Sequence, residues 1–178
     1  MDLRKTHLVW LTPLWIAFSS GCGSEEEAPL ADGLHLRYQW NFVGDVLFVD
    51  VTVKKVDDEH FLLEIKTEKD GETGEAEVRV DRFFKTESGE LAGLAEQPFW
   101  LPSSKRKKGA EVVADGSISM RKERKWDRWN VWMAGGGAVI GTVNWYFEKE
   151  TGFLVGSYAE SMGSGISLKL LETNVPGL

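Results

Sequence analysis

Apolar side chains occupy every second position over much of this chain, and this period restricts the possible folds more than any other feature of the sequence. Residues 34–42 (LHLRYQWNF) show it clearly, with apolar residues at all the even positions. Successive side chains of an extended strand point to opposite faces, so the segment would present one apolar and one polar face. The sequence therefore predicts a half-buried β-strand here.

Further segments of this kind are separated by short stretches rich in glycine and aspartate. They span residues 45–56, 61–69, 75–84, 110–113, 117–124, 137–148, 152–162 and 165–173. Short connections between successive strands favour hairpins. A chain of 178 residues has room for one domain of ordinary size. We predict an all-β, single-domain fold in which an antiparallel up-and-down meander forms a curved sheet or an open barrel.

Residues 121–134 (RKERKWDRWNVWMA) fit two structures. As one short helix, the segment would place its tryptophans on one side and its basic residues on the other. As a hairpin, it would bend at Asp127–Arg128, with residues 129–134 pairing with the next strand after a glycine link at residues 135–137. The aromatic and β-branched content favours the hairpin.

Residues 98–102 (PFWLP) interrupt the pattern of strands. Three large apolar residues stand between two prolines, and proline removes a backbone N–H that a central strand needs. We predict an apolar plug held in an extended loop.

Charge and cysteine content exclude several classes of protein. The formal net charge is -7, from 21 Lys and Arg against 28 Asp and Glu, whereas nucleic-acid-binding domains usually carry a basic excess. The one cysteine and the three histidines have no zinc-type spacing. We therefore expect no nucleic-acid partner, no metal and no cofactor.

The sequence offers no catalytic constellation. Nucleophile-elbow, phosphate-loop and zinc-protease motifs do not occur. His35 and His60 are expected to face solvent, and acidic pairs such as Asp57–Asp58 and Glu148/Glu150 fall in predicted turns, where hydration explains them better than a carboxylate pair or a calcium site. We expect no catalytic residues and no enzymatic activity.

The N-terminal segment has the features of an export signal. Arg4 and Lys5 precede an apolar run at residues 8–18 (LVWLTPLWIAF), which is shorter than the ~20 residues that span a bilayer. Small residues at positions 19–21 lead to Cys22. The acidic stretch that follows, residues 23–33 (GSEEEAPLADG), buries too little apolar surface to fold alone.

This arrangement resembles a bacterial lipoprotein signal peptide, with Ser20 and Gly21 matching the lipobox and Ser19 standing where the family prefers leucine. The resemblance implies removal of residues 1–21 and acylation of Cys22, for example with palmitate, and two or three acyl chains make a stable anchor. It predicts an acidic flexible tether at residues 22–33, a β-domain at 34–174 and a tail at 175–178. An ordinary signal peptide and a retained anchor helix remain as alternatives.

Tryptophan is the remaining candidate for a binding function. Four tryptophans follow one another in the C-terminal half, and we take them as candidate ligand-contacting aromatics: Trp126, Trp129, Trp132 and Trp145. Packing in the core is the other interpretation. At the level of architecture, a tethered meander resembles the half-barrels of the lipoprotein-carrier type, and the hairpin NWYFEKETGFLVG is similar to hairpins of uncharacterised small prokaryotic lipoproteins.

These observations predict an extracytoplasmic, membrane-anchored lipoprotein. Its domain would act without catalysis, as a binding or envelope-assembly module for an apolar ligand or a protein partner. The alternatives are a hydrolase that uses carboxylates gathered from loops, and a purely structural surface lipoprotein.

Overall fold

The computed structural model describes residues 28–42, 44–88, 98–112, 118–138, 141–161 and 164–178. Within these ranges the chain forms ten strands and one short 3-10 helix, η1 (Ser103–Lys105). The strands are β1 (His35–Phe42), β2 (Asp45–Lys55), β3 (His60–Lys69), β4 (Glu72–Asp81), β5 (Thr86–Ser88), β6 (Ile118–Trp126), β7 (Trp129–Ala138), β8 (Gly141–Glu148), β9 (Leu154–Ser161) and β10 (Ser164–Thr173). The prediction of an all-β fold is confirmed.

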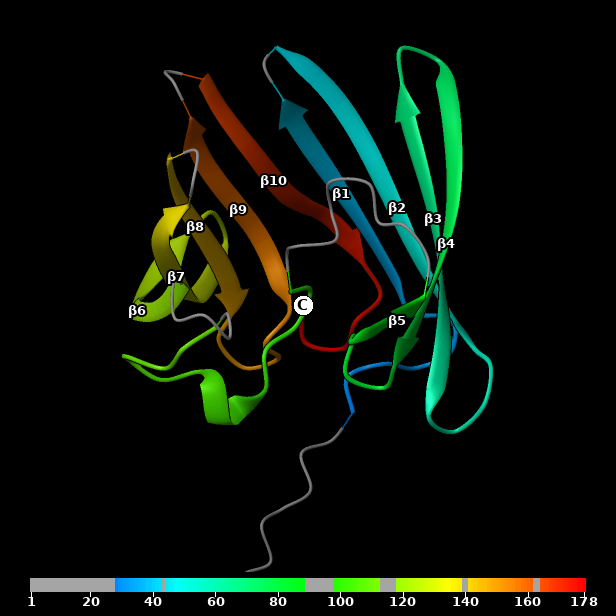
Figure 1. Cartoon of the computed structure of the whole chain (residues 1–178), viewed down its shortest axis with the longest axis horizontal. Coiled ribbons are helices and arrows are strands. Elements are labelled where there is room, and N and C mark those ends of the chain that lie inside the picture. The colour runs from blue at the N-terminus through cyan, green and yellow to red at the C-terminus, as the bar shows by residue number, and fades with distance from the viewer. Residues whose placement is uncertain (1–27, 43, 89–97, 113–117, 139–140, 162–163) are drawn as a thin grey trace, which may run out of the picture.

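All ten strands lie in one antiparallel sheet that does not close (Figure 1). Their order is β5-β4-β3-β2-β1-β10-β9-β8-β7-β6. Each half of the chain is therefore a five-stranded meander, and the two halves join where the first strand pairs with the last. The short β5 and the longer β6 form the two edges of the sheet.

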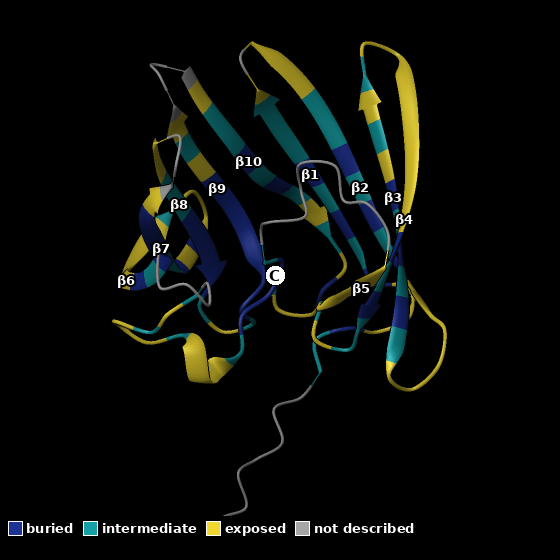
Figure 2. Cartoon of the chain, viewed as in Figure 1, coloured by how far each residue is buried: buried dark blue, intermediate teal, exposed yellow. Residues whose placement is uncertain are grey.

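One face of the sheet, which we call the inner face, carries the core. Leu36 of β1 lies opposite Val51 of β2, which lies opposite Ile65 of β3, and all three are buried. A second row of opposed residues crosses the sheet from β2 to β6: Leu47, Trp40, Leu168, Ser157, Trp145, Ala134 and Met120. Figure 2 shows burial concentrated toward the end at which β1 begins, with exposed residues along the first half of β4.

Residues 121–134 form the β6–β7 hairpin and not a helix. The two-residue turn lies at Asp127 and Arg128, as the strand interpretation expected, and Asp127 has a positive φ of 51°. The predicted glycine link is wrong, because residues 135–137 lie within β7 and the connection to β8 falls after Ala138. A Cβ on Gly135 would lie 2.7 Å from Asn144 Oδ1, so the absent side chain lets a neighbouring side chain pass over the strand.

The PFWL segment is a plug, as predicted. Phe99, Trp100 and Leu101 are buried. The Phe99 carbonyl accepts a hydrogen bond from Leu154 N–H at 2.8 Å, and the Phe99 ring lies 6.0 Å from Tyr38 between centroids. The plug thereby closes the core at the end of the sheet where β9 begins.

The tip of the β6–β7 hairpin packs against the outer face. The Trp126 indole stacks on Tyr146 of β8, with centroids 4.8 Å apart and ring planes 11° apart, and it lies over Gly156 of β9. Asp127 forms an ion pair with Lys169 of β10 at 3.2 Å. The hairpin therefore reaches across three strands.

Both ends of the described chain contact the sheet. Leu30, within the segment that the sequence assigns to a tether, is buried, and Gly33 N–H donates to the Val53 carbonyl at 2.9 Å. Val175, in the expected tail, is buried as well. Packing against the core therefore extends from Leu30 to Leu178, which is partly buried.

Candidate binding site

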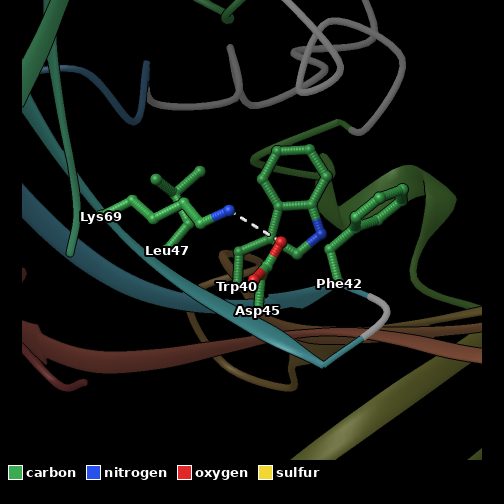
Figure 3. Close-up of a pocket in the computed structure, with 5 residues that line it drawn as sticks. All are labelled: Trp40, Phe42, Asp45, Leu47 and Lys69. Carbon is green, nitrogen blue, oxygen red and sulfur yellow. Dashed lines mark hydrogen bonds and ion pairs between the residues drawn. The ribbon is translucent and has the colours of Figure 1, made fainter. Parts of the chain in front are cut away.

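A pocket of about 220 Å³ opens on the inner face at the turn between β1 and β2 (Figure 3). It is lined by Trp40 and Phe42 from the end of β1, Asp45 and Leu47 from the start of β2, and Lys69 from the end of β3. Trp40 lies opposite Leu47, and Phe42 lies opposite Asp45. Alternation in both strands therefore directs all four of these side chains to one face.

The wall of the pocket is mainly aromatic and aliphatic. The Trp40 and Phe42 rings meet edge to face, with centroids 6.4 Å apart and planes at 73°. Phe42 is 49% exposed, which is unusual for a large apolar side chain that points to the core side of a sheet. The pocket thus offers apolar surface that no described residue covers.

A single ion pair provides the polar part of the pocket. Lys69 Nζ donates to Asp45 Oδ2 at 2.7 Å, and both side chains are about half exposed (Figure 3). This hydrogen bond raises the pKa of the Lys69 ammonium, and the Asp45 charge adds to the effect. The pair neutralises itself, so the rim carries polarity without net charge.

The indole of Trp40 contributes an unused donor. Its Nε1 is buried and has no hydrogen-bond acceptor among the described residues. Figure 3 shows this nitrogen on the side of the indole toward Phe42. Leaving a buried donor without a partner costs about 1–3 kcal/mol. Because this nitrogen has almost no exposed surface, a ligand oxygen would have to displace neighbouring side chains to accept this hydrogen bond.

The four tryptophans selected from the sequence do not form one site. Trp132 and Trp145 lie on the inner face, because they oppose Phe147 and Ala134 respectively. Trp126 and Trp129 oppose each other across the hairpin, with Trp126 on the outer face against Tyr146. Trp129 and Trp145 are buried, and Trp132 is half-buried. Of the four, Trp145 shares its row with Trp40.

The histidines and acidic turns have structural partners. His35 Nε2 lies 3.0 Å from Asp50 Oδ1, and His60 Nδ1 lies 2.7 Å from Asp57 Oδ1. Hydrogen bonds from the backbone of Glu59 and from His60 lower the pKa of Asp57. The contact of His35 joins β1 to β2, and the contact of His60 stabilises the β2–β3 turn.

Glu148 is buried at the end of β8. Its carboxylate accepts hydrogen bonds from the N–H groups of Glu150 and Thr151, at 2.9 and 2.6 Å, and from the Thr151 hydroxyl at 2.8 Å. Glu148 of this acidic pair therefore has a structural role that hydration does not describe, whereas Glu150 is exposed.

A second depression, of about 370 Å³, is polar. Glu123, Arg124, Asn130, Val131, Lys149 and Glu150 line it. Lys149 Nζ donates to Glu123 Oε2 at 2.6 Å, which raises the pKa of Lys149. In the described ranges, no three His, Cys, Asp or Glu side chains gather as metal ligands would.

The predicted lipidation site, Cys22, lies outside the described residues, as does the predicted signal peptide, residues 1–21. Among the described helices, none has the length and hydrophobicity needed to cross a bilayer.

No protein-family model and no curated protein sequence matches this chain. Among solved structures it is similar to MucB, with a TM-score of 0.50 and 11% identity over 85% of this chain and 56% of that one. It is also similar to a chain of the Pseudomonas aeruginosa MucA/MucB complex, with a TM-score of 0.50 and 12% identity over 83% and 53% of the two chains. For a hypothetical protein, CT021 from Chlamydia trachomatis, the TM-score is 0.49 and the identity 9%, over 83% and 92%.

This chain thus spans about half the length of the MucB-type chains. At identities of 11% and 12%, the likeness to them shows a shared fold.

Proposed function

We propose that this protein is a lipid-anchored, extracytoplasmic binding module without enzymatic activity, and that it receives an apolar group of a ligand or partner protein in the pocket at Trp40 and Phe42. The observation that carries the proposal is the exposed aromatic wall of this pocket, with a buried indole N–H that lacks an acceptor. Apolar walls with few polar groups are typical of binding sites.

The size of the pocket restricts what enters it. Sites for whole drug-sized ligands measure about 300–1,000 Å³, and this pocket measures about 220 Å³. It suits part of a larger molecule, such as the end of an acyl chain or one apolar side chain of a partner. A neutral rim suits such a group better than it suits a free ion.

Two further observations support a binding role. A chain with this fold has been solved within a two-protein complex, MucA/MucB. In addition, His35, His60 and Glu148 are engaged in contacts within and between strands and turns. No observation on the described residues favours the alternative hydrolase or a purely structural role.

The position of the pocket suits an anchor at Cys22. Figure 1 shows residues 28–34 and the start of β1 at one end of the sheet, and the β1–β2 turn at the other. An anchored chain would therefore hold its pocket away from the anchor.

Binding is tested by titrating the full chain, in a non-ionic detergent below its micelle concentration, with a palmitate that carries a terminal pyrene. Tryptophan-to-pyrene energy transfer reports binding. We expect saturable transfer that Phe42→Ala weakens by about tenfold or more, because truncating a buried aromatic contact costs more than about 1.4 kcal/mol. Val46→Ala is the matched control, because Val46 lies on β2 beside the pocket and is 42% exposed on the other face.

Equal loss of affinity in the two variants would refute the assignment of this pocket. Absence of saturable binding would refute an acyl ligand. The anchor is tested separately by mass spectrometry of the N-terminal peptide of the membrane-extracted protein: acylated Cys22 is expected, and an unmodified residue or another start would refute the lipoprotein assignment.

A further inference from the structure

Both edges of the sheet contain a stretch of backbone that no described strand pairs with. At one edge, β5 pairs with β4 only at Arg79 and Val80, which leaves residues 72–77 of β4 without a strand partner among the described residues on that side. At the other edge, residues 109–112 form backbone hydrogen bonds with β6 only at Ile118 and Met120. Residues 121–126 therefore have no strand partner on that side among the described residues. Residues 72–77 and 121–125 are all exposed, and Trp126 is half-buried.

The two open stretches carry opposite charge. Residues 72–77 (ETGEAE) contain three glutamates and no basic residue, a net charge of -3. Residues 121–126 (RKERKW) contain four basic residues and one glutamate, a net charge of +3. We call them the acidic edge and the basic edge.

This contrast extends over the two ends of the sheet. Residues 45–88, which form β2 to β5, contain 13 acidic and seven basic residues, a net charge of -6. Residues 105–128, which run from η1 through β6, contain nine basic and four acidic residues, a net charge of +5. The strand order places these regions at opposite ends of the sheet.

We propose that a second copy of this chain docks its acidic edge on the basic edge of the first, which continues the antiparallel sheet from one molecule into the next. An open edge strand offers backbone N–H and C=O groups to any strand of suitable charge. Like charges oppose pairing of two basic or two acidic edges, whereas unlike edges attract. The acidic edge and the basic edge are both six residues long, so they can pair over their whole length.

The side-chain faces agree with this pairing. Glu75 and Glu77 alternate with Ala76, which opposes the core residue Ile65, so both glutamates lie on the outer face. On β6 the irregularity at Arg121 brings Lys122 and Arg124 to the outer face, opposite Met133 and Val131. A continued sheet that keeps its inner faces on one side therefore sets two glutamates against two basic side chains.

Part of the basic edge is free for this role, whereas Arg124 Nε donates to the Lys125 carbonyl at 3.4 Å and the Arg124 guanidinium lies 5.9 Å from the centroid of the Tyr146 ring. Lys122 and Lys125 make no ion pair or side-chain hydrogen bond with any residue in the described part of the chain. Glu75 contacts Lys66 of its own sheet at 3.3 Å, with both side chains mostly exposed. Contacts between such exposed groups are weak and exchangeable.

The two edges differ, so the contact is head-to-tail, and repetition gives short open chains of molecules in place of a closed dimer. The proposal does not depend on the pocket at Trp40.

Sedimentation velocity of the full chain in non-ionic detergent tests the proposal through a charge swap. We expect concentration-dependent association at low salt that weakens as salt is added. Reversing one edge, with Lys122→Glu and Arg124→Glu or with Glu75→Lys and Glu77→Lys, should weaken association at least about tenfold. Combining both reversals, or mixing the two singly reversed proteins, should restore it.

Lys107→Glu with Lys108→Glu is the matched control. It makes the same change of net charge at two exposed lysines outside residues 121–126 whose side chains have no partner among the described residues, and it should weaken association far less than reversal of the edge does. Circular dichroism verifies that each variant is folded.

A monomer at every concentration in low salt would overturn the proposal. Association that survives reversal of one edge, or that the double reversal does not restore, would also overturn it. Capture of an unrelated acidic peptide by the basic edge with no self-association would assign the edge to another partner and would equally refute self-association.

Discussion

Replacing Gly156 by alanine should loosen the contact that holds the β6–β7 hairpin on the outer face. A Cβ at this position would overlap the Trp126 indole and would lie 2.8 Å from the Leu168 carbonyl oxygen. Trp126 stacks on Tyr146 and is flanked by the Asp127–Lys169 ion pair. The alanine methyl group therefore has to displace the indole from its stack.

The expected cost follows from these contacts. Overpacking costs about 1–3 kcal/mol, and loss of an aromatic stack adds about 0.5–1.5 kcal/mol. The reduced freedom of the unfolded chain returns about 0.4–1 kcal/mol. We therefore expect the free energy of unfolding to fall by about 0.5–4 kcal/mol, with a decrease in Tm of about 2–4 °C per kcal/mol for a chain of this size.

Urea denaturation followed by circular dichroism measures this change. Gly137→Ala in β7 is the matched control, because nothing lies within 4 Å of a Cβ there, and it should be neutral or slightly stabilising. In a Trp126→Ala background the cost of Gly156→Ala should fall by at least about 1 kcal/mol.

Equal stability of the Gly156→Ala and Gly137→Ala proteins would refute this reasoning. So would an equal cost of Gly156→Ala in the presence and absence of the Trp126 side chain, because the two residues would then act independently.

Two further predictions concern buried polar groups. Tyr38→Phe should cost about 1–3 kcal/mol in urea denaturation, because it leaves the Leu154 carbonyl without the hydroxyl that donates to it at 2.9 Å. Burial also raises the pKa of Tyr38 above its usual value of 10.0, so the folded chain holds this proton more tightly than the unfolded chain does. Wild-type stability should therefore decrease as pH rises above about 10, and Tyr38→Phe should reduce that decrease. An unchanged dependence of stability on pH in the variant would contradict this assignment. Glu148→Ala should cost about 2–3 kcal/mol by the same assay, because three hydrogen bonds of the β8–β9 turn end on its carboxylate, whereas the exposed Glu150→Ala should change stability by less than about 0.5 kcal/mol.

Much of the fold could be predicted because side-chain alternation is a local property. Residues 34–42 show it in the sequence and form β1 almost to the residue. The choice of strands for residues 121–134 rested on aromatic and β-branched residues, and Asp127–Arg128 does form the turn. The order of strands, with β1 beside β10, depends on pairing between distant segments and could not be read from local patterns.

The misplaced glycine link has a similar cause. Glycines at positions 135–137 weaken the preference for a strand, and the side chains that pass over Gly135, from Asn144 and Arg121, explain the glycine at that one position within β7. These neighbours come from other strands.

The candidate site was harder to predict than the fold. Trp40 and Phe42 continue the same alternation as Leu36 and Tyr38, so they resemble core residues in the sequence. Phe42 is exposed because it lies at the rim of an open sheet. The irregularity at Arg121 changes which β6 side chains face outward, and it places Trp126 against Tyr146. The tryptophans that are close in sequence therefore form two groups in space, with Trp126 and Trp129 in one and Trp132 and Trp145 in the other.

The central claim, that the rim pocket receives an apolar group, is tested most directly by photo-crosslinking in cells. A benzophenone amino acid is incorporated in place of Phe42 and, as the control, in place of Val46 on the other face of the neighbouring strand. After irradiation, intact-protein mass spectrometry should find a discrete adduct at position 42 that is absent at position 46, and its mass distinguishes an acyl chain from a protein partner. Equal labelling at both positions, or no adduct at position 42, would contradict the claim.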